Sequence, residues 1–206
     1  MGHVIYESIK LLADHYSENL KGKVDERMAE MAPDDNSHYL IYRVLGVSNK
    51  EGSIIDLYQN KGRFLYKYAG SFLEEAAIAC FKQKYPDAEK VRIPNIVSTR
   101  PKTFEIDCLV NGLAHEIKWR DATTDGDHIA KEHTRIQAIS KAGYIPIRVM
   151  FYYPNRVQAQ RIQQTLETLY KGVGGEYYYG DAAFEYVKNY TGVDLLEVLN
   201  RIADER

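Results

Sequence analysis

The sequence contains little cysteine and no long apolar run. Its two cysteines, Cys80 and Cys108, are far apart and both lie among apolar residues, which predicts buried free thiols in a reducing, cytoplasmic compartment and excludes a disulfide framework. No segment approaches the ~20 apolar residues that a membrane-spanning helix needs. The first helical stretch carries Glu7, Lys10 and Asp14, so it does not resemble a signal peptide.

An excess of basic charge is also missing. The chain has 27 Lys and Arg against 29 Asp and Glu, a net charge of −2, so a nucleic-acid partner requires a local positive surface assembled by folding. No glycine-rich stretch forms a Walker loop or a dinucleotide-binding fingerprint. The six histidines and two cysteines lack the spacing of a zinc site.

Helical patterns fill almost all of the first 85 residues. The periodicity predicts helices over about 4–20 and 25–31, a third through "HYLIYRVLG", and further helical sequence from Ile54 onwards that includes 69–85. A length of 206 residues fits one compact domain. Within it we distinguish a helical region at 1–69, a core at 70–154 and a second helical region at 155–206.

Short β-branched and alternating segments follow the helices. They predict strands at 90–97, 103–110, 113–119 and 144–154. A helix at 127–143 carries Ile129, His133, Ile136 and Ser140 on one stripe, with Ile139 beside it. This helix makes the last strand parallel to the one before the helix. Three helices are predicted at 155–172, 181–192 and 193–205, and a Tyr-rich loop with a short extended piece lies between the first and the second. The predicted fold class is α/β (α+β), a mixed sheet flanked by helices, with helical additions at both ends.

The segment "FEIDCLVNGLAHEIKWR" (104–120) predicts a β-hairpin with unusual charges. Asn-Gly between alternating runs favours a type I′ turn, and counting outward from Asn111-Gly112 places Asp107 opposite Glu116. Their Cβ atoms are then about 5 Å apart. Lys118 lies on the same face because strand side chains alternate with a period of two.

Two facing carboxylates destabilise a hairpin unless a cation lies between them or one pKa is raised. Mg²⁺ takes one or two carboxylates together with waters and phosphate oxygens, so the pair predicts a magnesium site with Lys118 beside it. The plainer alternative is a solvated face on which the acids pair with the lysine. Coverage of the sheet on both faces favours the metal site, because buried charges need partners.

The hairpin, followed by a helix and a strand, resembles the core of the PD-(D/E)XK nuclease superfamily. The matching pattern is Asp107, then eight residues, then Glu116-Ile117-Lys118. The α-β-β-β-α-β order of that fold matches residues 70–153, and 115–156 look most like type II restriction endonucleases of the ApaLI-like kind. The resemblance implies that Asp107, Glu116 and the Ile117 carbonyl bind the metal. It also implies that Lys118 positions or deprotonates the attacking water. It also implies an acid on the preceding helix, for which Glu74 fits better than Glu75. The chain departs from the motif at Ile106, where the family has proline.

The same resemblance implies the activity. A type II restriction endonuclease of prokaryotic type would use one or two Mg²⁺ per active site to cut double-stranded DNA and leave 5′-phosphates. A homodimer would match a palindromic sequence, with no membrane partner. Two other readings within this fold are a junction-resolving or repair nuclease, which cuts by structure, and a catalytically silent DNA-binding or interaction protein.

A calcium-binding loop is the main rival. Residues 121–132 nearly satisfy the EF-hand pattern, with acids at Asp121, Asp125, Asp127 and Glu132. The pattern needs a preceding helix, however, and here a strand precedes it. In the competing interpretation Asp125 or Asp127 caps the next helix and the rest is a loop near the scissile phosphate.

Four basic residues are candidates for DNA contacts: Lys131, His133, Arg135 and Arg120. Lys and Arg side chains near an active site bind phosphates or bases. Alternatively, Lys131 and Arg135 pair with acids such as Glu132, and His133 faces the core. We interpret His115 and Trp119 as packing residues, because they alternate away from the acidic face.

Overall fold

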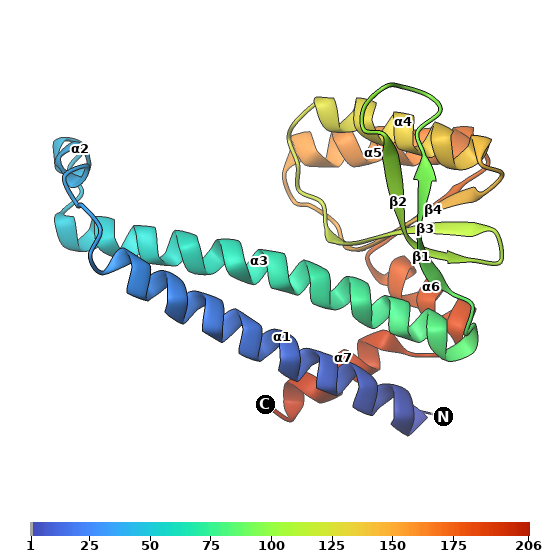
Figure 1. Ribbon diagram of the computed structural model, residues 1–206, viewed down its shortest axis with the longest axis horizontal. Coiled ribbons are helices and arrows are strands. Elements are labelled where there is room, and N and C mark those ends of the chain that lie inside the picture. Colours follow the sequence, from blue (N-terminus) through green and yellow to red (C-terminus); the bar gives the residue numbers. More distant parts are fainter. Residues whose placement is uncertain (1) are drawn as a thin grey trace. The chain divides into compact units, whose positions relative to one another are not determined.

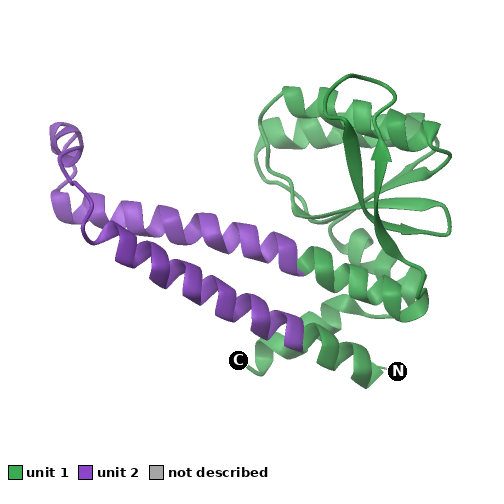
Figure 2. Ribbon diagram, viewed as in Figure 1, with its two compact units in different colours: residues 1–10, 73–206 green, residues 11–72 purple. Residues whose placement is uncertain are grey.

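The computed structural model describes residues 2–206, which form two compact units (Figure 2). Unit 1 combines the chain up to Lys10 with Leu73–Arg206, and unit 2 is Leu11–Phe72. In chain order the elements are α1 (Gly2–Met31), α2 (Tyr39–Val44), α3 (Asn49–Lys84), β1 (Glu89–Pro94), β2 (Thr103–Val110), β3 (Leu113–Arg120), α4 (Asp127–Lys141), β4 (Ile145–Tyr152), α5 (Val157–Gly172), β5 (Glu176–Tyr179), α6 (Asp181–Thr191) and α7 (Leu195–Asp204).

Unit 1 is built on one five-stranded mixed sheet with the order β1-β2-β3-β4-β5. The first three strands are antiparallel, and β4 and β5 run parallel to β3. The end of α3, the strands β1 to β3, α4 and β4 follow one another in the predicted α-β-β-β-α-β order. The predicted fold class, a mixed sheet flanked by helices, is confirmed.

Helices cover both faces of this sheet (Figure 1). On one face, α4 and α5 bury a cluster that includes Ile136, Met150 and Leu166. On the other face, the ring of His115 lies against Phe81 of α3 and Tyr186 of α6. Charges placed on β3 are therefore enclosed, as a crossover-covered strand requires.

The β2–β3 turn has the geometry that its sequence predicts. Asn111 and Gly112 have φ values of 50° and 77°, the positive angles that a type I′ turn needs. Cys80 and Cys108 are free and buried, and burial raises the pKa of each thiol to about 12. The prediction of buried free thiols is confirmed.

Helix α4 buries a different stripe from the predicted one. Ile136 is buried as expected, but His133 and Ser140 are exposed. The buried stripe instead runs through Glu132, Ile136 and Ile139, spaced by four and three residues as on one helix face. Of the two alternatives left open for His133, a core position and a surface position, the structure shows the surface position.

Unit 2 contains most of α1, all of α2 and the first two thirds of α3. Two helices are longer than predicted, since α1 continues through 21–24 and α3 runs unbroken from Asn49. Ser48 and Glu51 start α3 with a capping box: the Glu51 N–H donates to Ser48 Oγ at 3.2 Å and the Ser48 N–H to Glu51 Oε2 at 2.9 Å. No helix among residues 2–206 is long and apolar enough to cross a membrane.

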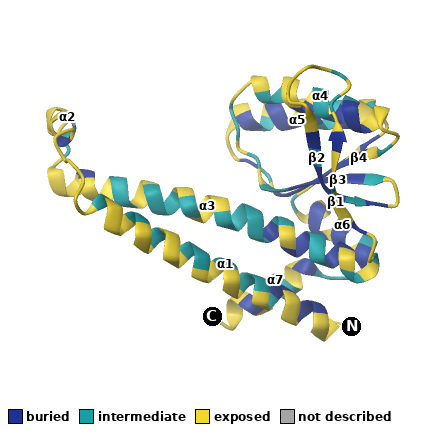
Figure 3. Cartoon of the chain, in the orientation of Figure 1, coloured by how far each residue is buried: buried dark blue, intermediate teal, exposed yellow. Residues whose placement is uncertain are grey.

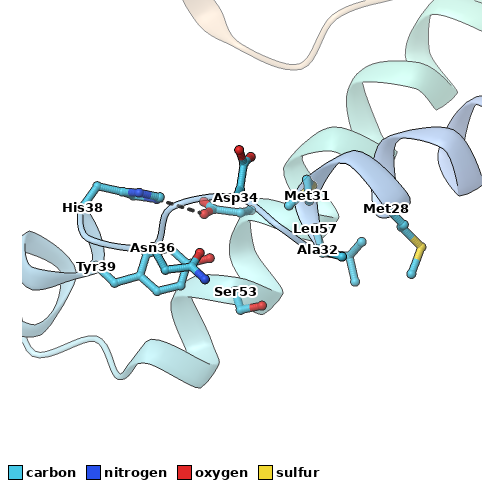
Figure 4. A pocket seen from close by; sticks show the side chains of 10 residues that line it. Met28, Met31, Ala32, Asp34, Asn36, His38, Tyr39, Ser53 and Leu57 are labelled. Carbon is cyan, nitrogen blue, oxygen red and sulfur yellow. Dashed lines mark ion pairs between the residues drawn. The ribbon is translucent and has the colours of Figure 1, made fainter.

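A hollow of about 290 Å³ lies where α2 meets α1 and α3 within unit 2 (Figure 4). Asp56 of α3 holds α2 there, accepting from Tyr42 Oη at 3.1 Å and lying 3.5 Å from His38 Nε2. Tyr39 stacks on Tyr42 with ring centroids 5.3 Å apart. Aromatic packing and one carboxylate therefore attach this six-residue helix.

Candidate active site

The structure brings Asp107, Glu116 and Lys118 together on unit 1. Lys118 Nζ lies 2.6 Å from Glu116 Oε1 and 3.8 Å from Asp107 Oδ2. The two carboxylate side chains are only 9% and 4% exposed, while Lys118 is 33% exposed. The ammonium thus bridges two buried carboxylates from the open side of the site.

The backbone pairing of β2 with β3 ends next to Asp107. The β2–β3 partners are Val110–Leu113, Leu109–Ala114 and Cys108–His115, which is the register counted from the Asn-Gly turn. Asp107 is the next residue along β2, and its Oδ2 accepts the Ile117 N–H at 2.8 Å. A side chain therefore takes the backbone donor, which fixes the Asp107 carboxylate beside Glu116.

An ion network extends from these acids beneath the surface. Arg135 of α4 bonds to Glu116 Oε2 and lies 3.6 Å from Glu132. Glu132 Oε2 in turn accepts from Arg148 at 3.1 Å. Arg148 is fully buried on β4, where its register partner is Glu116 on β3. Both oxygens of Glu116 are consequently held by cations, Lys118 on one and Arg135 on the other.

The loop after β3 supplies the last members of the network. Asp121 Oδ2 accepts from Arg148 at 2.5 Å and lies 2.9 Å from His128 Nε2. Burial opposes ionisation of Asp121, but the hydrogen bond from His128 and the charge of Arg148 hold its pKa well below the usual value. Asp121 and Glu132, the two ends of the calcium-loop pattern, thus neutralise one buried guanidinium. A strand precedes the loop, unlike in an EF-hand.

The two central carboxylates differ in their affinity for protons. Burial, followed by the charge of Glu116, raises the pKa of Asp107 from 3.8 to about 7. Burial also disfavours ionised Glu116, but Lys118, Arg135 and Arg148 together lower its pKa. The pair therefore favours one neutral acid and one carboxylate near neutral pH, the expected result when like charges share a buried site.

The raised pKa predicts a loss of stability on ionisation of Asp107. Between pH 4 and 7 the folded chain keeps a proton that the unfolded chain releases, so the free energy of unfolding should fall with rising pH by up to ~1.4 kcal/mol per unit. Above about pH 7 this contribution should level off. Urea unfolding of the metal-free protein at several pH values would measure it, with Asp107→Asn as the comparison. Equal slopes for the two proteins over this range would contradict the assignment.

Glu74 lies near the same site but has another partner. Lys90 Nζ on β1 is 2.9 Å from Glu74 Oε1, and the charge of Glu74 contributes to the raised pKa of Asp107. Glu74 is half-buried, whereas Glu75 on the same helix is exposed. The geometry favours Glu74 over Glu75 as the acid of the preceding helix.

The carboxylates suit a hard divalent cation. Asp107 and Glu116 offer oxygen ligands, which Mg²⁺ prefers, and a metal that keeps several waters needs only one or two of them. Among residues 2–206, no three His, Cys, Asp or Glu side chains converge as a complete set of metal ligands. Metal binding would therefore require Arg135 or Lys118 to release a Glu116 oxygen, and water or phosphate oxygens to complete the coordination.

The four predicted DNA-contact residues occupy different environments. Arg135 is half-buried on Glu116, while Lys131, His133 and Arg120 are exposed. His133 Nε2 accepts a local hydrogen bond from Gln137 Nε2 at 3.0 Å. The interpretation of His115 as a packing residue is confirmed, because it is buried and bonded to Tyr186 Oη at 2.8 Å.

Sequence reasoning missed Arg148 altogether. A sequence signal was available, since Arg148 is the single charged residue in the otherwise apolar strand "IPIRVMFY". A lone arginine in a covered strand must meet acids, because isolated charges are too costly to bury. The sequence pattern suggested Asp121 and Glu132 as calcium ligands. Their shared partner, Arg148, could not be identified because the contact depends on tertiary packing.

A comparison with known protein families identifies the chain's family. The family model described as "ApaLI-like restriction endonuclease" matches residues 1–204. No curated protein and no solved structure matches the chain.

Proposed function

Because the chain belongs to the ApaLI-like restriction endonuclease family, we propose that it is a Mg²⁺-dependent type II enzyme that cuts both strands of a short palindromic DNA sequence. Membership of the family makes the chain a nuclease with DNA as its substrate. The bridging of two buried carboxylates by Lys118 is the observation that supports this site as the place of hydrolysis.

In the proposed reaction, Asp107 and Glu116 hold the metal, together with the Ile117 carbonyl. Bound Mg²⁺ would lower the pKa of a water molecule and stabilise charge on the phosphate oxygens. Lys118 would orient the attacking water, and its ammonium would stabilise the developing negative charge. Glu74 would orient this group or bind a second ion, after exchanging its contact with Lys90. The products would carry 5′-phosphates.

Arg135 has a second role in this proposal. Its guanidinium lies on Glu116 before substrate arrives, and a scissile phosphate is the anion to which it can transfer. Arginine binds phosphate oxygens in a bidentate manner with good geometry. The exposed residues Lys131, His133 and Arg120 would contact the DNA around that phosphate.

A homodimer is the proposed assembly. Two copies related by a two-fold axis place one active site on each strand of a palindromic site. The chain carries one Asp107–Glu116–Lys118 group, so one copy provides for one strand.

Cleavage of natural DNA tests the activity. Purified protein incubated with phage DNA and Mg²⁺ should yield a fixed set of fragments with 5′-phosphate ends, and none when the metal is chelated. A junction-resolving or repair nuclease would give no defined pattern on intact linear duplex. A protein that retains DNA without cutting it in Mg²⁺ would contradict the proposed activity.

A further inference from the structure

Helix α3 carries an apolar stripe whose larger side chains are mostly exposed among the described residues 2–206. It runs through Ile55, Tyr58, Gly62, Leu65 and Ala69 within unit 2. Ile55, Tyr58 and Leu65 are 54%, 66% and 51% exposed. Exposed and half-buried residues follow this part of the helix in Figure 3. The spacing of three, four, three and four residues is that of one coiled-coil seam.

The stripe is separate from the face with which α3 packs on α1. That face contains Asn60, which bonds to Arg27 and Met31, and Tyr68, which lies 6.0 Å from Tyr16 between ring centroids. A rotation of about 100° per residue turns the stripe away from this face by roughly a third of the circumference. The hairpin of α1 and α3 therefore does not use the stripe for its own packing.

Gly62 lies at the centre of the stripe, and no contact among residues 2–206 requires a glycine at this position. A Cβ built on Gly62 meets no atom within 4 Å, and its backbone lies inside an unbroken helix. Glycine in a helix interior costs about 1 kcal/mol relative to alanine. A glycine at a helix surface becomes useful when another helix approaches closely, because the missing side chain lets the two backbones come together.

We infer that this stripe is the contact with a second copy of the chain, with the two α3 helices crossing at Gly62. The residues are spaced almost symmetrically about Gly62. A two-fold axis at this point therefore sets Tyr58 of one copy against Leu65 of the other, and Ile55 against Ala69. Such self-complementarity is what a two-fold interface requires.

Charge favours protein over DNA as the occupant. None of the five stripe residues is charged, and residues 11–72 contain 8 Lys and Arg against 9 Asp and Glu. A surface that binds the phosphate backbone needs a basic excess. An apolar stripe without that excess suits another apolar helix.

The size of the stripe limits the affinity. Ile55, Tyr58 and Leu65, together with the neighbouring exposed Ile54, offer roughly 400 Å² of apolar surface, about half of the ~800 Å² per partner in a standard stable interface. Flanking polar side chains must supply the rest. We therefore expect a dimer that dissociates on dilution.

The choice of a second copy as partner rests on the homodimer of the proposed function. Sedimentation equilibrium measures the mass of the protein without DNA. It therefore tests the proposed dimer contact independently of the proposed nuclease activity. A protein that cuts DNA yet is monomeric at every concentration would overturn the inference and leave the nuclease activity standing.

Two glycine variants of the full chain provide the test, measured by sedimentation equilibrium over a wide concentration range. Gly62→Ala should weaken dimerisation at least roughly tenfold (about 1.4 kcal/mol), although alanine favours the helix. Gly22→Ala is the matched control, because Gly22 also lies inside a helix with open space at its Cβ. It should leave the dimer unchanged.

Thermal unfolding shows that neither variant is misfolded, since both should unfold at or above the wild-type temperature. Leu65→Glu should also produce monomers, because it introduces a charge into the apolar contact. Dimerisation of wild-type strength in both Gly62→Ala and Leu65→Glu would overturn the inference and place the dimer contact on another surface.

Discussion

Replacing Lys118 by alanine should lower the rate of DNA cleavage by about 10²–10³-fold, the usual cost of removing one group that stabilises developing charge. Lys118 is the cation that contacts both Glu116 and Asp107, and it is the most exposed of the three. It can therefore meet both substrate and carboxylates. Single-turnover cleavage of a plasmid carrying one site, at saturating Mg²⁺, measures the effect on chemistry.

The variant should remain folded. Glu116 retains Arg135 and Asp107 retains the Ile117 N–H, so removal of Lys118 leaves each carboxylate with a partner. Lys171→Ala is the matched control, because Lys171 is exposed on α5 and pairs only with Glu167 four residues away. We expect the control to cut at the wild-type rate, and a Lys118→Ala protein that also does so would refute the assignment.

A complementary measurement separates binding from chemistry. DNA retention by Lys118→Ala without Mg²⁺ should stay within a few-fold of wild type, since most affinity for duplex comes from several phosphate contacts. Loss of retention together with cleavage would make Lys118 a DNA-binding residue. In that case the assignment of Lys118 to the chemical step would be wrong.

The hairpin could be predicted because its signals are local. Asn111-Gly112 fixes the turn, and the two-residue period of a strand then gives the register through Cys108–His115. The contact made by Asp107 could not be predicted from the sequence pattern alone. Whether Asp107 continues the backbone ladder or accepts the Ile117 N–H depends on how β2 and β3 separate.

The ion network beneath the site could not be predicted in the same way. Arg148, Glu132 and Asp121 come from β4, α4 and the loop between β3 and α4, so their contacts depend on tertiary packing. Helical periodicity placed His133 on one stripe with Ile136 but gave no sign that Glu132 is buried, because burial of a charged residue is possible when a partner is present. Glu132 is buried against Arg148 and His133 is exposed.

Local helix signals gave the class of the first 85 residues but not the helix boundaries. The predicted helices left out residues 21–24 and 48–53, which contain Gly22 and Gly52, yet α1 and α3 pass through both glycines. Tertiary packing outweighs a propensity cost of about 1 kcal/mol at each glycine. Propensity alone therefore underestimates the length of helices that are supported by a neighbour.

Removing the buried arginine should destabilise the protein more than any other single change to the site. Arg148→Met would leave Glu132 and Asp121 without their shared cation in the interior. Breaking a buried ion pair by removing one partner typically costs 3–5 kcal/mol, and we expect about this loss in the free energy of unfolding. Urea denaturation monitored by circular dichroism would measure it.

Two further variants show whether the loss comes from the two acids that have lost Arg148. Lys171→Met removes an exposed i,i+4 pair with Glu167, so it should change the free energy of unfolding by less than about 0.5 kcal/mol. Adding Glu132→Leu to Arg148→Met should restore part of the stability, because an apolar pair of similar volume replaces a stranded charge. His128 still pairs with Asp121 in that double variant. If the double variant were as unstable as the sum of Arg148→Met and Glu132→Leu, each measured alone, the two residues would not be coupled and Arg148 would act through packing alone.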